Sequence, residues 1–72
     1  MAGNRRISLH SAPQLLDVVE LAAGRPDAGL AAGSLGTIGE ILDARSYLVE
    51  FCDASGRTLA IETLSESDFR LA

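Results

Sequence analysis

Between Ala31 and Leu64, short apolar runs alternate with glycines and polar pairs at close intervals: AAGSLGTIGEILDARSYLVEFCDASGRTLAIETL. Apolar runs of about four to eight residues between turn residues are typical of β-strands. Short strands joined by tight turns let a small chain bury the inside of a curled antiparallel sheet and protect its edges. The pattern therefore predicts an all-β fold of the small-barrel type.

Two segments show the clearest strand alternation. In SYLVEF, Tyr47, Val49 and Phe51 share one face, because successive side chains of a strand point to opposite sides. RTLAIETL alternates again, and we expect Leu59 and Ile61 to point inward. The predicted core consists of Val19, Leu21, Ile38, Val49, Phe51, Leu59 and Ile61.

The connections between these strands are also marked in the sequence. GTIGEILD changes phase, since Ile38 and Ile41 cannot share a face on a regular strand, and Gly39 between them indicates a bulge or bend. DASG predicts a hairpin turn in which Gly56 takes a positive φ. SESD predicts a short turn or one-turn helix, and FRL a closing strand.

The segment SAPQLLDVVELAAG leaves two interpretations open. Ser11 and Gln14 fit a helical capping box, and the apolar residues recur at helical spacing. Val18 and Val19 are β-branched, however, and the run over residues 15–21 has the length of a strand. The residues alone slightly favour a helix over residues 15–23.

Length and cysteine content limit how this chain can be stabilised. Seventy-two residues make one small domain, whose core alone supplies roughly 3–5 kcal/mol of net stability. Cys52 is the only cysteine, so no disulfide forms within the chain, and His10 lies too far along the chain to suggest a zinc site with it. We expect no metal and no cofactor, and we expect stabilisation by self-association or by docking on another chain.

The charge balance narrows the class of partner. Ten carboxylates against six arginines give a net charge of -4, and the acids are spread from Asp17 to Asp68. Nucleic-acid modules usually carry a basic patch and aromatic stacking platforms, so nucleic acid is disfavoured as a partner. No apolar run has the roughly 18 residues of a membrane span, and no signal peptide is evident. With a free thiol, these features predict a cytoplasmic protein that binds no membrane.

Five segments in order, LLDVVEL, RPDAGL, GSLGTIGEIL, YLVEF and GRTLAIETL, resemble the small bacterial domain-of-unknown-function family 4926, over Leu15 to Leu71. The resemblance implies an SH3-like barrel of about five antiparallel strands, which we expect over residues 15–72. The residues before it, which include Gly3, Asn4 and two arginines, predict a flexible arm over residues 1–14. The resemblance also implies that LDVVEL is the first strand. Gly39 and Cys52 depart from the β-branched and apolar residues expected there. Family members resemble companions of a second small protein, which implies a toxin–antitoxin or immunity-type pairing.

The residues that could carry chemistry favour structural roles. GSLGTIG is followed by a strand and the chain has no lysine, so it is a turn and no phosphate loop. We expect His10 to be a solvated residue of the arm and Cys52 to be a buried or half-buried small apolar residue with no activating base nearby. Glu40, Glu50 and Glu62 are predicted on outward positions of neighbouring strands, as a solvated face or a row that binds a cation or a basic partner. We therefore predict no catalytic residues.

The loop from Arg25 to Leu35 is the segment predicted to contact a partner. It is glycine-rich and longer than a minimal turn, yet it carries two leucines, which a plain connection does not need. We expect Leu30 to tuck under the barrel and Arg25 and Asp27 to stay exposed at its rim. The candidate partner-binding residues are Arg25, Asp27, Leu30 and Leu35.

These observations predict a non-enzymatic protein-interaction module, of the antitoxin or immunity type or an accessory subunit. Its partner is another protein chain, either a different protein or a second copy. One alternative is a small nucleic-acid-binding barrel, which a salt-sensitive oligonucleotide shift would reveal. Another is a subunit of an oligomeric enzyme whose site is assembled across subunits.

Overall fold

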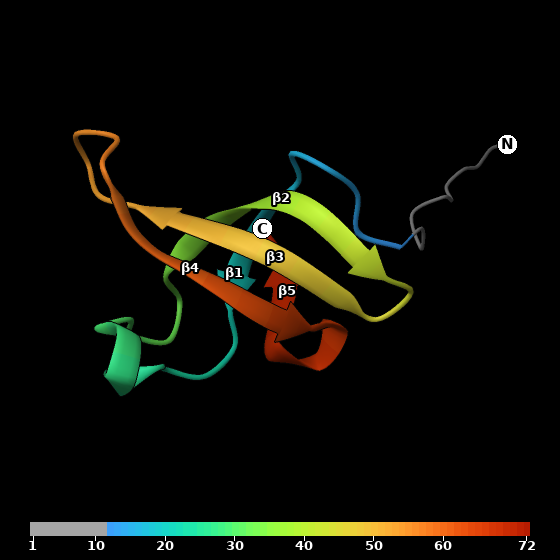
Figure 1. Ribbon diagram of the computed structural model, residues 1–72. Helices are drawn as coiled ribbons and strands as arrows, with labels where there is room; N and C mark the ends of the chain where they lie inside the picture. The colour runs from blue at the N-terminus through green and yellow to red at the C-terminus, as the bar shows by residue number, and fades with distance from the viewer. Residues whose placement is uncertain (1–11) are drawn as a thin grey trace, which may run out of the picture.

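The computed structural model describes residues 12–72, which form one sheet of five antiparallel strands with no α-helix among them (Figure 1). The strands are β1 (Val18–Leu21), β2 (Leu35–Asp43), β3 (Ser46–Cys52), β4 (Thr58–Ser65) and β5 (Phe69–Leu71), in the spatial order β4-β3-β2-β1-β5. Two short 3-10 helices lie between strands: η2 (Pro26–Ala28) between β1 and β2, and η3 (Glu66–Asp68) between β4 and β5. The predicted all-β class with five antiparallel strands is confirmed. Most of the predicted arm, including His10, lies outside the described residues.

The first strand settles the open interpretation of residues 15–23. β1 pairs with β2 on one side and with β5 on the other, so that Val19 lies opposite both Gly36 and Leu71. Val19 and Leu21 are fully buried while Val18 is exposed, which is the alternation of a strand. The helix favoured by the residues alone is wrong, because pairing on both sides outweighs a weak local propensity.

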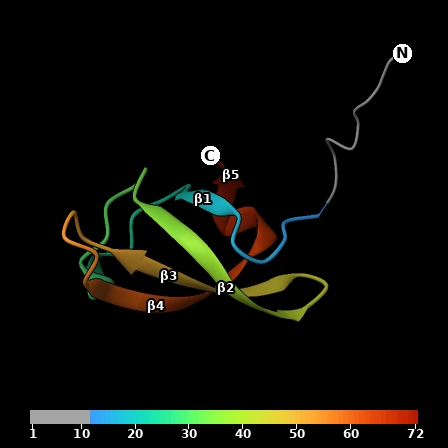
Figure 2. The same ribbon diagram turned by 90° about the horizontal axis from the view of Figure 1, so that it is seen from above.

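The bulge predicted in β2 is present, and it brings the residues on its two sides back to the same face of the sheet. The register with β3 shifts between Ile38 and Glu40, so that Ile38 lies opposite Val49 and Ile41 opposite Tyr47. Both isoleucines therefore face the same side of the sheet. Figure 2 shows the result from above: β3 and β4 lie on one side of β2, and β1 and β5 on the other, so the sheet curls about β2.

The turns follow the predicted chemistry. Gly56 has a φ of 87° in the β3–β4 hairpin, where the carboxylate of Asp53 accepts hydrogen bonds from Ser55. These bonds, led by the one from the Ser55 side chain, lower the pKa of Asp53. At the end of β4, the Ser65 N–H donates to Asp68 Oδ2 at 2.8 Å and closes a capping box over η3.

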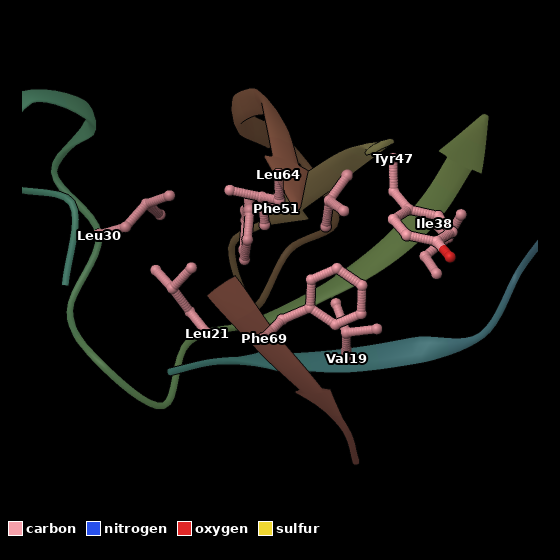
Figure 3. Close-up of a cluster of buried hydrophobic side chains, with 9 residues drawn as sticks. Val19, Leu21, Leu30, Ile38, Tyr47, Phe51, Leu64 and Phe69 are labelled. Carbon is pink, nitrogen blue, oxygen red and sulfur yellow. The ribbon is translucent and has the colours of Figure 1, made fainter. Parts of the chain in front are cut away.

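One hydrophobic core fills the inside of the curled sheet (Figure 3). The rings of Tyr47 and Phe69 meet edge to face, with centroids 5.5 Å apart. The buried residues are Val19, Leu21, Leu30, Ile38, Tyr47, Val49, Phe51, Leu64 and Phe69. Five of the seven predicted core residues are among them.

The prediction that Leu59 and Ile61 are buried is wrong. Ala60 lies opposite Phe51 and Leu64 opposite Tyr47, so Ala60, Glu62 and Leu64 face the core. Leu59 and Ile61 occupy the other face and are 58% and 56% exposed. β4 carries apolar residues on both of its faces, so its sequence alone does not show which face is buried. The pairing with β3 turns the face that contains Leu64 toward the core.

Replacing Phe51 with alanine should destabilise the fold by about 3–5 kcal/mol, because the ring is almost fully buried and its loss leaves a cavity. Urea unfolding monitored by circular dichroism measures this change. Leu59→Ala is the matched control on the exposed face and should change the free energy of unfolding by less than about 1 kcal/mol. Equal losses in the two variants would contradict the assignment of the two faces.

Candidate functional site

A groove of about 490 Å³ opens between η2 and β4. In Figure 1, η2 lies beside the first half of β4, although residues 29–57 separate the two elements in the chain. One wall is formed by Arg25, Pro26, Asp27 and Ala28, and the other by Leu59, Ala60, Ile61 and Glu62. We call this hollow the β4 groove.

The loop wall of the β4 groove is held by its own backbone and by Leu30. The Arg25 N–H donates to the Leu30 oxygen at 2.7 Å, and the Leu30 N–H donates to the Arg25 oxygen at 3.0 Å. Gly29 takes a φ of 71°, which glycine adopts without strain. Leu30 is buried in the core, as the sequence predicts, so it anchors the wall from behind and is not accessible to a partner.

Arg25 ties this loop to two other elements. Its guanidinium lies 3.1 Å from Asp68 Oδ2 of η3 and 3.6 Å from Glu62 Oε1 of β4. Arg25 is half-buried, so the expectation of a freely exposed rim charge is wrong for it. Asp27, in contrast, is exposed in the groove wall.

Hydrogen bonds keep the carboxylate of Asp68 available to Arg25. The backbone N–H of Ser65 contributes most to lowering the pKa of Asp68, and the Ser65 hydroxyl and the Arg25 charge lower it further. Partial burial opposes them. Near neutral pH the group is therefore an anion that pairs with Arg25 and helps to position the loop.

The outer face of the sheet borders the groove along β4. Ile61 lies opposite Glu50 of β3, and the Thr58 hydroxyl donates to the Glu50 carboxylate. The predicted row of Glu40, Glu50 and Glu62 does not form. Glu62 lies on the inner side of β4, opposite Val49, where Arg25 pairs with it.

Cys52 is exposed, so the prediction that it is buried or half-buried is wrong. It ends β3 on the outer face, with its sulfur 3.8 Å from Glu50 Oε2. This contact supplies neither the histidine nor the cation that usually accompanies a nucleophilic cysteine.

A second hollow of about 410 Å³ lies between the β2–β3 turn and η3. Its lining residues are all polar or charged: Arg45, Ser65, Glu66 and Ser67. Across residues 12–72, no three His, Cys, Asp or Glu side chains are grouped as a metal site requires. None of the helices in that range is long and apolar enough to cross a membrane.

The structure divides the four predicted partner-binding residues. Arg25 and Asp27 line the β4 groove, Leu30 lies behind its wall, and Leu35 is exposed at the start of β2, outside the groove lining. The sequence analysis missed the β4 wall, because it placed Leu59 inside. Leu64 could have indicated the correct face of β4, because it lies on the same face as Ala60 and Glu62. If Leu64 points inward, Leu59 and Ile61 point outward.

The chain belongs to a family of unknown function. The family model described as Domain of unknown function (DUF4926) matches residues 15–71. This match confirms the family that the five sequence segments indicate. Neither the curated proteins nor the solved structures contain a match to the chain.

Arg25→Glu should lower the stability of the fold by about 1–2 kcal/mol, because it replaces two half-exposed ion pairs with repulsion from Glu62 and Asp68. Asp27→Arg is the matched charge reversal in the same loop and should leave the melting temperature nearly unchanged. Thermal unfolding of the two single variants measures the difference. Equal melting temperatures for both would show that Arg25 does not hold the loop.

Stability should also depend on the ionisation of Asp68. Its pKa is lowered in the folded state, so its contribution is complete above the unfolded value of about 3.9 and is lost as the pH falls through the folded pKa. Asp68→Asn should therefore melt a few degrees below wild type at pH 7 and approach wild type once the pH has fallen through the folded pKa of Asp68. Melting curves from pH 2 to 8 measure this. A constant difference across the range would assign the effect to packing.

Proposed function

We propose that this DUF4926 protein is a non-enzymatic interaction module that binds another protein chain at the β4 groove and the adjoining outer face of β4. The observation that carries the proposal is the exposure of Leu59 and Ile61, at 58% and 56%, along one wall of that groove. Apolar side chains grouped beside a concave site are typical of protein-binding surfaces.

The arrangement of the groove supports protein binding over catalysis. Its lining consists of aliphatic side chains from β4, a proline and an alanine from η2, and three charged groups, two of which pair with each other. It holds no cysteine or histidine, and the exposed Cys52 lies outside its lining. The charges can orient a partner at the rim, while the apolar side chains supply the buried contact.

Chain length supports a role inside a complex. A domain of this size, matched by the family model over residues 15–71 and with nine buried core side chains, has a small margin of stability. A partner that binds the folded state stabilises it by mass action. We therefore place the protein among antitoxin or immunity-type proteins and accessory subunits, with an SH3-like barrel and a cytoplasmic location that suits its single thiol.

The expected partner can be tested with a matched pair of surface variants. A tagged Leu59→Ser, Ile61→Ser protein removes the exposed apolar side chains of the groove. A tagged Leu15→Ser, Leu42→Ser protein removes two others of similar exposure, at 55% and 46%, outside the groove lining. Affinity purification from the source cells, followed by titration with the purified partner, should show binding to wild type and control and a loss of at least about tenfold for the groove variant.

Two results would contradict this proposal. One is a protein that purifies alone under mild conditions. The other is a stoichiometric partner that binds the groove variant as tightly as it binds wild type. Melting curves of both variants are required, because loss of binding is informative only while the fold is retained.

A further inference from the structure

The pattern of backbone hydrogen bonds in the sheet shows which N–H and C=O groups of β4 point away from β3. The Ile38 N–H donates to the Asp17 oxygen at 3.0 Å, and the Ile38 oxygen accepts from the Leu16 N–H at 2.9 Å. The backbone of Ile38 thus faces the β1 side of β2. In an antiparallel sheet, hydrogen bonding alternates along each strand, so the neighbouring residue faces the opposite side.

This alternation can be followed to the edge of the sheet. Thr37 faces β3, where it lies opposite Glu50. Val49, the next residue of β3, consequently faces β4, where it lies opposite Glu62. The N–H and C=O of Ile61 therefore point away from β3, at the free edge of β4 and in the lining of the groove.

This edge lacks the residue types and the short length that commonly prevent a strand from pairing with another chain. Within residues 12–72, no backbone hydrogen bond joins Ile61 or Thr63 to a group beyond the β3–β4 ladder. β4 has eight residues, contains no lysine or proline, and carries one charge, on Glu62, which Arg25 pairs with. Natural edge strands are commonly protected by such residues or by their short length.

We propose that the partner contributes an extended segment that adds to β4 as a further strand within the β4 groove. This inference rests on the proposed function, and it names the form of the binding segment. Main-chain hydrogen bonds to Ile61 would supply affinity, and alternate side chains would supply specificity.

The two sides of β4 define the chemistry of that segment. Side chains on its outer side lie beside Leu59 and Ile61, so they are apolar. Side chains on its inner side lie toward Asp27 and Glu62. The charged cluster there contains one positive group against three negative ones: Arg25, Asp27, Glu62 and Asp68. The segment therefore alternates apolar with basic residues.

The groove wall formed by residues 25–28 leaves room for a single added strand but obstructs a second copy of this chain. Pairing two β4 edges would place the partner's β3 beyond its β4, where Pro26 and Ala28 form the far wall. An isolated segment needs only the width between that wall and β4. The occupant is accordingly a partner segment that extends from its own fold.

The experiment uses two labelled peptides, one alternating valine with arginine and one alternating valine with glutamate. Fluorescence anisotropy with wild-type protein should show saturable binding of the valine–arginine peptide and at least about tenfold weaker binding of the valine–glutamate peptide. Ile61→Pro removes the outward N–H and is tolerated where that group faces solvent. It should weaken binding about tenfold relative to Ile61→Ala, which keeps the N–H. Thr63→Pro and Thr63→Ala form a second pair at the same edge.

The other outcomes overturn either the strand addition or its proposed occupant. No saturable binding, equal binding of both peptides, or equal affinities of folded proline and alanine variants would overturn the strand addition. A wild-type dimer that Ile61→Pro dissociates would make a second copy the occupant. A partner that is lost with Leu59→Ser, Ile61→Ser but binds Ile61→Pro like Ile61→Ala would leave the proposed function standing without strand pairing.

Discussion

The pairing of β2 with strands on both sides is the interaction on which the rest of this structure depends. Gly36 lies in the tightest place of that pairing, opposite Phe51 and Val19. A Cβ at this position would lie 2.7 Å from Val49 Cγ1 and 2.9 Å from the Phe51 ring, so glycine lets these core side chains pack directly against the strand. A bulge after Ile38 then shifts the register of the remaining part of β2, and the sheet curls around the core.

The groove is a consequence of that curled sheet. Curling brings η3 and the end of β4 close enough to the loop after β1 for Arg25 to contact both. Leu30 fills the core beneath the same loop. The loop is thus fixed by burial on one side and by ion pairs on the other, which leaves a walled space beside an edge strand whose outward backbone groups are free to pair.

Two kinds of binding surface meet at this place. The outer face offers the apolar side chains of Leu59 and Ile61, and the edge offers directional hydrogen bonds. In strand addition, main-chain hydrogen bonds supply affinity and set the register, whereas the alternate side chains supply specificity. The proposed protein partner suits a surface that combines them better than a small molecule would, because the groove provides few converging polar groups.

The sequence by itself determined the all-β class, the bulge at Gly39, the turn at Gly56 and five of the core residues, because these depend on local periodicity and on what glycine permits. It could not determine whether residues 15–23 form a strand, since that depends on pairing with β2 and β5, or which phase of β4 faces inward. The β4 groove is likewise a feature that only the tertiary structure decided. Its walls come from segments far apart in the chain, and only the register of β4 against β3 decides that Ile61 is exposed and Glu62 lies within reach of Arg25.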